Sequence, residues 1–234
     1  MVRTKICGVT NEADLRAVER AGADAVGVVA DVAVETPREV PVEDAARLVA
    51  AAPPFLTTTL VTMPESEGDA VDVATEVAPD VLQIHGGFAP AAFREIRESV
   101  AAKLVAVVDA EAPERAREVA PAVDAVLVDS VDESGAGGTG ETHDWAATAE
   151  VTRTLDAPVI LAGGLDPENV AEAVEAVRPF AVDVASGVEA RGGEKDHDAV
   201  RRFVANASAA DVRTDADDAE ATGDDDPTVE EVSS

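Results

Sequence analysis

The sequence predicts an α/β fold, a closed (β/α)8 (TIM) barrel, in a single catalytic domain that spans residues 1–208. Three observations lead to this prediction. Short runs rich in β-branched residues alternate with segments of helical pattern, which is typical of parallel β-α units. There are eight such pairs, whereas an open doubly wound sheet usually has about five or six strands. Polar residues also recur where the strands end, as in barrel enzymes.

The elements follow one another regularly along the chain. The expected strands are residues 3–7, 23–29, 55–61, 80–85, 103–108, 124–129, 158–163 and 180–186. The expected helices lie near residues 11–21, 42–52, 68–78, 89–101, 112–120, 144–155, 167–177 and 196–207. Thr10 and Asn11 are start signals for the first helix, and Asp166 followed by Pro167 is a start signal for the seventh.

The charge of the chain is strongly negative. It has 48 acidic and 18 basic residues, for a formal net charge of −30. Such a charge excludes nucleic-acid binding, which depends on Lys and Arg neutralising phosphates. Residues 209–234 combine few apolar groups with many acids and should form a disordered acidic tail. From Asp211 onward the net charge is −9, which leaves −21 on the body. The body itself is therefore acidic, and we interpret this as adaptation to a salt-rich, halophilic cytoplasm.

The few cysteines and histidines, and the lack of a long apolar run, limit the location and the kinds of site that the sequence allows. A single cysteine cannot form an internal disulfide, so a cytoplasmic location is expected. No apolar run approaches the ~20 residues that span a bilayer, so no membrane association is expected. His85, His143 and His197 show no paired spacing and no cysteine cluster accompanies them, so no metal site is predicted.

Alternation along the strands places several polar groups inside the barrel, because successive strand residues point to opposite faces. Cys7, His85 and Asp129 then lie at the C-terminal ends of their strands, where barrel enzymes place their chemistry. Lys5 and Asp183 lie deeper, on strands that become neighbours on closure of the barrel. We expect them to pair, because an isolated buried charge is costly.

Two loops have the composition of an anion site. Gly163 and Gly164 follow the seventh expected strand, and Ser186 and Gly187 follow the eighth, where they could open a short extra helix. Phosphate bound between these two loops recurs in barrel enzymes, and backbone N–H groups bind anions without a basic patch.

Residues 135–142, GAGGTGET, resemble a nucleotide-binding P-loop, but Glu141 stands where that loop needs its lysine. We interpret the segment as a flexible lid after the sixth strand.

Seven segments together resemble the phosphoribosylanthranilate isomerase family of tryptophan biosynthesis, and they cover residues 2 to about 207 in order. They are KICGVT (5–10), PREV (37–40), LQIHG (82–86), VLVDS (126–130), GGTGETHDW (137–145), LAGGLDPENV (161–170) and RPFAVDVASGVEARGGEKDH (178–197). The resemblance implies a cofactor-independent Amadori rearrangement of N-(5-phosphoribosyl)anthranilate, with Asp129 as general acid and Cys7 as general base. It also implies substrate binding by Arg38, His85, Gly163, Gly164, Asp183, Ser186 and Gly187. Arg38 would hold the anthranilate carboxylate, and the enzyme would be a monomer or homodimer.

The chemistry makes demands on both catalytic groups. A free Asp titrates near ~4 and a free Cys near ~8.5, so neither is in its useful form at neutral pH. The pKa of Asp129 would need to be raised, and Cys7 would need a share of thiolate, which Lys5 on the same face could favour.

Three alternatives stay open from the sequence. One is another phosphosugar isomerase or epimerase, although the paired acids and metal ligands of such epimerases are absent. The second is a non-catalytic phosphosugar-binding barrel, which would have no need of both Cys7 and Asp129. The third is acceptance of a second substrate, the related histidine-pathway aminoaldose, although the sequence indicates one phosphate site rather than two.

Overall fold

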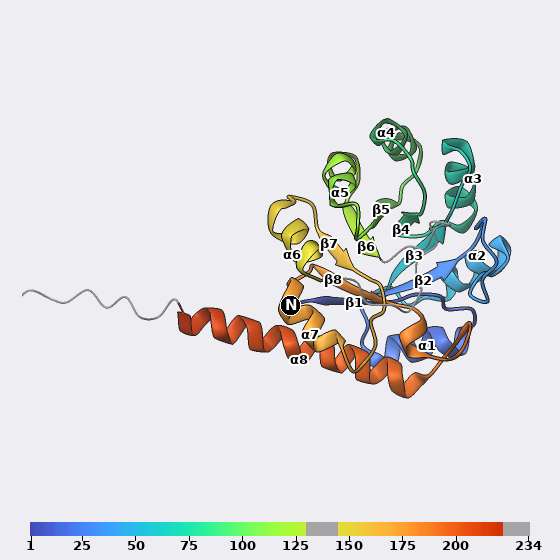
Figure 1. Cartoon of the computed structure of the whole chain (residues 1–234). Helices are drawn as coiled ribbons and strands as arrows, with labels where there is room; N and C mark the ends of the chain where they lie inside the picture. Colours follow the sequence, from blue (N-terminus) through green and yellow to red (C-terminus); the bar gives the residue numbers. More distant parts are fainter. Residues whose placement is uncertain (130–144, 222–234) are drawn as a thin grey trace, which may run out of the picture.

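The structure is a computed structural model that describes residues 1–129 and 145–221, with the backbone alone for residues 211–221. Eight parallel strands pair in sequence order and close into a barrel surrounded by helices (Figure 1). The strands are β1 (Arg3–Ile6), β2 (Ala25–Val29), β3 (Thr57–Thr62), β4 (Val81–Ile84), β5 (Lys103–Asp109), β6 (Ala125–Asp129), β7 (Val159–Leu161) and β8 (Ala181–Val184). The predicted (β/α)8 barrel is confirmed, and no strand exceeds its expected range by more than one residue.

The helices occupy the expected positions between the strands. They are α1 (Glu12–Ala21), α2 (Val42–Ala51), α3 (Glu67–Val77), α4 (Pro90–Ser99), α5 (Pro113–Val119), α6 (Trp145–Thr154), α7 (Val170–Val177) and α8 (His197–Ala221), with a 3₁₀ turn η1 (Ala120–Ala122) after α5. Asn11 caps α1 as expected, because its side chain accepts a hydrogen bond from the N–H of Asp14 (2.9 Å). Helix α7 begins later than predicted, because residues 167–169 form a turn in which Asp166 accepts the N–H groups of Glu168 and Asn169.

The chain after β8 differs from the prediction in two ways. A 3₁₀ turn, η2 (Ser186–Val188), matches the expected short extra helix, but a two-stranded hairpin of β9 (Glu189–Arg191) and β10 (Glu194–Lys195) follows it and was not predicted. Helix α8 continues to Ala221, so residue 208 is not the end of regular structure. The alanines in this stretch favour a helix despite its charge. Residues 222–234 lie outside the described residues, and the disorder of the tail stays a prediction.

Apolar side chains form an outer layer and an inner layer of the barrel. The outer layer lies between strands and helices, and Phe93 of α4 and Phe203 of α8 are among its fully buried side chains. The inner layer includes Val105, Leu127 and Ile160 in the interior of the barrel. Apolar side chains therefore fill the barrel interior beneath the C-terminal ends of the strands, and polar groups lie at those ends.

Aspartates secure the opposite, N-terminal ends of three strands. Each precedes one strand and accepts the N–H of the neighbouring strand: Asp24 from Thr4 (2.8 Å), Asp80 from Thr58 (2.8 Å) and Asp124 from Leu104 (2.9 Å). In the part of the chain that the structure describes, no helix has both the length and the apolar character to cross a bilayer.

Candidate active site

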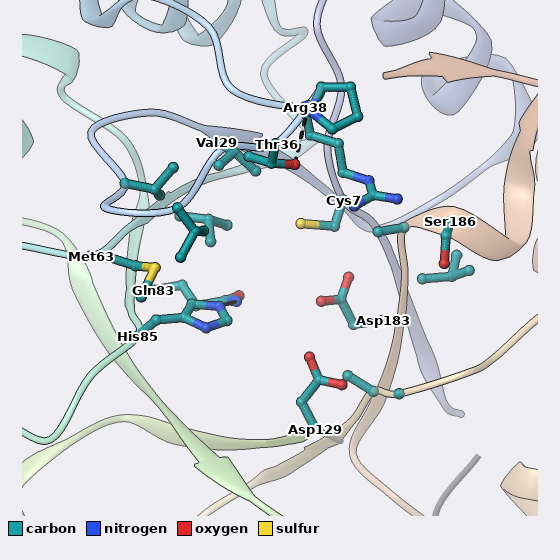
Figure 2. Close-up of a pocket in the computed structure, with 18 of the residues that line it drawn as sticks. Cys7, Val29, Thr36, Arg38, Met63, Gln83, His85, Asp129, Asp183 and Ser186 are labelled. Atoms are coloured by element: carbon teal, nitrogen blue, oxygen red, sulfur yellow. Dashed lines mark hydrogen bonds between the residues drawn. The ribbon is translucent and has the colours of Figure 1, made fainter. Parts of the chain in front are cut away.

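A cavity of about 390 Å³ opens at the C-terminal ends of the strands. Its polar lining comes from several strands that are far apart in sequence. Cys7 follows β1, His85 follows β4, Asp129 ends β6, and Asp183 lies on β8. Figure 2 shows these side chains around one common space, with the Cys7 thiol and the Asp129 carboxyl on different sides of it. The alternation of side chains along the strands therefore placed all four correctly.

Cys7 is fixed between strands and is 8% exposed. Its N–H donates to the carbonyl of Val184 (2.8 Å), and its side chain packs with Val29 and Val61. Gly27 of β2 makes room for it, because a Cβ atom at Gly27 would lie 2.8 Å from the sulfur. Sequence reasoning missed Gly27, although its alternation with Val26 and Val28 was a signal that it faces the interior.

Lys5 and Asp183 form the predicted ion pair. The register of β1 and β8 places them side by side, and Lys5 Nζ lies 2.8 Å from Asp183 Oδ2 with both side chains almost inaccessible. Burial disfavours the charge on Lys5, but Asp183 and Cys7 outweigh this effect and raise the pKa of Lys5 above its ordinary value. Lys5 is therefore a stable cation at the base of the cavity.

Several opposing influences act on the thiol. Burial raises the pKa of Cys7 above its ordinary value, Lys5 opposes this by charge and hydrogen bonding, Asp183 adds to it, and Lys195 opposes it. The net direction is upward, so the group rests mainly as a thiol at neutral pH. Lys5 and Lys195 limit this rise in the pKa of Cys7 but do not reverse it.

Asp129 and His85 line the cavity from β6 and from the end of β4, on either side of β5. Asp129 is 6% exposed at the end of β6, and the cavity separates it from Cys7 (Figure 2). His85 Nε2 lies 3.3 Å from Nε2 of Gln83, which is buried on the same face of β4. Gln83 also lines the cavity, although the sequence analysis did not place it among the site residues.

Arg38 reaches the cavity from the loop between β2 and α2 and makes a contact that was not foreseen. Its Nε and Nη2 groups donate to the two carboxylate oxygens of Glu189 (2.9 and 3.0 Å). The same carboxylate accepts Nζ of Lys195 (2.9 Å). Burial opposes the charge on Glu189, but Arg38 and then Lys195 outweigh it and lower the pKa of Glu189. Two cations therefore share one carboxylate beside the cavity.

Backbone from the loops after β7 and β8 forms another end of the cavity. Gly163 and Gly164 line it with positive φ angles of 88° and 62°, and Ser186 lines it from the other loop. Gly187 is not a lining residue. A Cβ atom there would lie 2.0 Å from the carbonyl oxygen of Leu165, so Gly187 lets the two loops touch. Its contact with the substrate stays a prediction.

One wall of the cavity is apolar, and it comes from the end of β2, the loop after β2 and the end of β3. It is formed by Val29, Val32, Val34, Val61 and Met63. Such a wall suits an aromatic ring, because burial of apolar surface favours binding. No group of three or more His, Cys, Asp or Glu in residues 1–129 and 145–210 is arranged to hold a metal ion. The proposed lid, residues 135–142, and His143 lie outside the described residues.

The chain matches a known family along most of its length. Residues 4–206 match the family model described as N-(5'-phosphoribosyl)anthranilate (PRA) isomerase. The chain is 61% identical over 210 residues to the N-(5'-phosphoribosyl)anthranilate isomerase of Haloferax volcanii, which covers 90% of this chain and 95% of that protein. The isomerase of Halorubrum lacusprofundi is 56% identical over 207 residues, covering 88% of this chain and 97% of that protein.

Solved structures agree with these matches. Phosphoribosyl anthranilate isomerase from Thermotoga maritima has a TM-score of 0.78 and 36% identity, covering 89% of this chain and 100% of that one. Another solved chain of this isomerase, in complex with reduced 1-(o-carboxyphenylamino)-1-deoxyribulose 5-phosphate, has a TM-score of 0.76 and 34% identity with the same coverage.

Proposed function

This chain belongs to the N-(5'-phosphoribosyl)anthranilate isomerase family and is an isomerase of tryptophan biosynthesis, and we propose that Cys7 and Asp129 carry out its chemistry. The reaction is an Amadori rearrangement to 1-(2-carboxyphenylamino)-1-deoxyribulose 5-phosphate. The observation that carries the assignment is that a thiol and a carboxyl group line one cavity from β1 and β6.

The proton transfers can be assigned to the two groups. Asp129 donates a proton to the ring oxygen of the ribose as the C1–O bond breaks, and the nitrogen lone pair forms the C1=N bond of an iminium. The Cys7 thiolate then removes the proton from C2, and the electrons of that bond form an enolamine. The C2 hydroxyl loses its proton, and C1 gains one, to give the ketone. General acid and base groups contribute typically about 10²–10⁴-fold to such steps.

The remaining contacts follow from the chemistry of the substrate. Arg38 would bind the anthranilate carboxylate, and the apolar wall beside it would take the aromatic ring. The backbone of Gly163, Gly164, Ser186 and Gly187 would bind the phosphate at the other end, where no Lys or Arg is among the described lining residues. His85 and Asp183 would contact the sugar between these two ends.

An isomerase assay and a binding measurement together test this proposal. We expect turnover of N-(5'-phosphoribosyl)anthranilate without added metal or cofactor, and binding of the reduced product analogue by calorimetry. A chain that binds the analogue yet never turns over substrate would instead be the non-catalytic barrel.

The acidic body suggests where the enzyme works. We propose a cytoplasm of high salt concentration, since screening relieves the repulsion among acidic groups. Activity measured across a KCl series should rise toward molar concentrations. An optimum in dilute buffer would contradict the halophilic interpretation and leave the reaction untouched.

The oligomeric state stays a choice between monomer and homodimer. A related isomerase from Thermotoga maritima is described as dimeric, and the solved structure is of monomers generated from it. Light scattering at the salt concentration of maximal activity distinguishes the two states for this chain.

A further inference from the structure

The hairpin β9–β10 carries a buried charge cluster beside the cavity. The cluster consists of Arg38, Glu189 and Lys195, whose side chains are 19%, 5% and 0% exposed. Glu189 accepts two hydrogen bonds from Arg38 and one from Lys195, all between 2.9 and 3.0 Å. Neither Glu189 nor Lys195 lines the cavity, so the two residues act behind it.

The charges of this cluster do not cancel. With all three groups ionised, two cations face one carboxylate, which leaves a surplus of one positive charge. A buried surplus charge is costly unless an anion lies close to it. The cavity offers two places for such an anion, the substrate carboxylate at Arg38 and the thiolate of Cys7.

Lys195 lies close enough to Cys7 for its charge to act on the thiol. Its Nζ donates to the carbonyl of Ala185 (3.0 Å), and Ala185 packs against the cluster that Cys7 forms with Val29 and Val61. The other charged groups that act on Cys7 are Lys5 and Asp183, which pair with each other. Asp129 and Arg38 line the same cavity, and Arg38 is already paired with Glu189. Burial lowers the pKa of Lys195, and the carboxylate of Glu189 opposes this effect. In its ionised form, Lys195 supplies positive charge that the Lys5–Asp183 pair does not.

Glu189 fixes the guanidinium of Arg38 in one orientation. The bidentate contact uses one edge of the guanidinium, formed by Nε and Nη2, and leaves Nη1 and the second Nη2 proton for another acceptor. The stem of Arg38 also lies close against Gly8, where a Cβ atom would lie 2.7 Å from Arg38 Cδ. A guanidinium that is already ordered loses less entropy when it binds a carboxylate.

The hairpin is tied firmly to the rest of the barrel. Thr10 donates to the carbonyl of Gly193 (2.7 Å), and the N–H of Lys195 donates to Asp14 Oδ2 (3.1 Å). His197 Nε2 lies 2.8 Å from the other oxygen of Asp14. The charges on the hairpin therefore have a fixed position relative to the loop that follows Cys7.

We propose that the hairpin is the positioning element of the active site, in which Glu189 orients Arg38 for the substrate carboxylate and Lys195 supplies positive charge toward Cys7. Both are positioning residues, since each acts through another group. This inference rests on the proposed roles of Cys7 and Arg38.

The effect of Lys195 is measured on the thiol itself, without substrate. Cys7 is the only cysteine in the chain, so thiolate absorbance or the rate of alkylation by iodoacetamide reports this one group. We expect Lys195→Met to move the thiol titration to higher pH by roughly one pH unit, because a nearby cation is lost. We also expect kcat to fall about tenfold with little change in KM, since the thiolate becomes rarer.

The matched control is Lys103→Met, which removes an exposed lysine that pairs with Asp124 at the N-terminal end of β5. It should leave the titration of Cys7 unchanged. A titration that is the same in Lys195→Met and wild type would overturn the role of Lys195, whether or not the enzyme turns over its substrate.

The effect of Glu189 is measured on carboxylate binding. We expect Glu189→Gln to weaken binding of the reduced product analogue about tenfold, because one charge-assisted bidentate contact is lost, and to raise KM more than it lowers kcat. Glu194→Gln makes the same change on the facing strand, where the carboxylate pairs with exposed Arg191, and should have no effect. Equal or tighter binding by Glu189→Gln would show that Glu189 competes with the substrate, and would overturn its positioning role.

A double variant guards against a loss of folding. Glu189→Gln/Lys195→Met removes one charge of each sign, so the barrel keeps its charge balance. Its thiol titration should still lie above that of wild type, and thermal unfolding followed by circular dichroism monitors the fold. A wild-type titration in the folded double variant would overturn the proposal even if Lys195→Met alone fails to fold.

Discussion

The two ends of the cavity are built by different means. At the Arg38 end, charged side chains from the β2–α2 loop and the β9–β10 hairpin meet in a buried cluster. At the end formed by the loops after β7 and β8, small residues bring the backbone to the surface of the cavity, and the loops touch at Gly187. One end presents ionised side chains to the cavity, and the other presents backbone groups.

This difference has a consequence for an enzyme with a net charge of −30. Backbone N–H groups carry no net charge and do not need a counterion. A guanidinium needs a buried carboxylate to hold it in place, and that carboxylate in turn receives a second cation. Binding at the backbone end should therefore respond to substitutions that change its shape. Binding at the Arg38 end should respond to substitutions that change its charge.

The largest effect should come from the groups that lie between the two ends. We expect Cys7→Ser and Asp129→Asn each to lower kcat by roughly 10²–10⁴-fold, because each removes a proton-transfer group. Binding of the reduced product analogue should change little, since neither end is altered. Single-turnover kinetics and calorimetry measure the two quantities. A loss of binding equal to the loss of turnover would mean that these residues belong to the binding ends instead.

The pH dependence of kcat/KM should report the ionisation of the same two groups, Cys7 and Asp129. The active state holds one proton between Cys7 and Asp129, so activity falls in alkali once the pair loses its last proton. Because burial raises the pKa of Cys7, kcat/KM should persist above the ordinary titration of cysteine near ~8.5 and then fall about tenfold per pH unit. A decline of kcat/KM that begins near neutral pH would contradict this assignment of the alkaline limb.

Substitution of Arg38 should weaken substrate binding at the side-chain end of the cavity alone. We expect Arg38→Lys to raise KM about tenfold or more, since lysine cannot keep the bidentate contact with Glu189 and also bind a carboxylate in a fixed direction. Inhibition by inorganic phosphate, which tests the other end, should be nearly unchanged. A parallel loss of phosphate inhibition would show that the two ends are not independent.

Substitution of Gly187 should weaken phosphate binding at the backbone end of the cavity alone. The added Cβ atom of Gly187→Ala would collide with the Leu165 carbonyl, so we expect a destabilisation of about 1–3 kcal/mol and several-fold weaker phosphate inhibition. The control is Gly87→Ala, where a Cβ atom would meet no atom within 4 Å. Urea unfolding and inhibition assays measure both effects. Unchanged phosphate inhibition in a folded Gly187→Ala variant would remove this loop contact from the binding site.

The features that depend on local pattern were predictable from the sequence. Alternation of β-branched runs and helical segments determined the barrel and the limits of its strands. The same alternation placed Cys7, His85, Asp129 and Asp183 toward one interior, because the side-chain period of a strand is fixed by its backbone. The Lys5–Asp183 pair was predictable as well, since closure of the barrel makes β1 and β8 neighbours.

Contacts between distant loops were decided only by the tertiary structure. Glu189 and Lys195 lie in a segment that was recognised by resemblance. No local period shows that Glu189 meets Arg38 across 151 positions of sequence, or that Lys195 meets the same carboxylate. The short hairpin that presents them has too few residues for a periodic signal. The close approach of Gly187 to the Leu165 carbonyl likewise depends on a loop from another part of the sequence. Strand patterns are imposed by the backbone itself, whereas loop contacts depend on how the completed barrel brings its loops together.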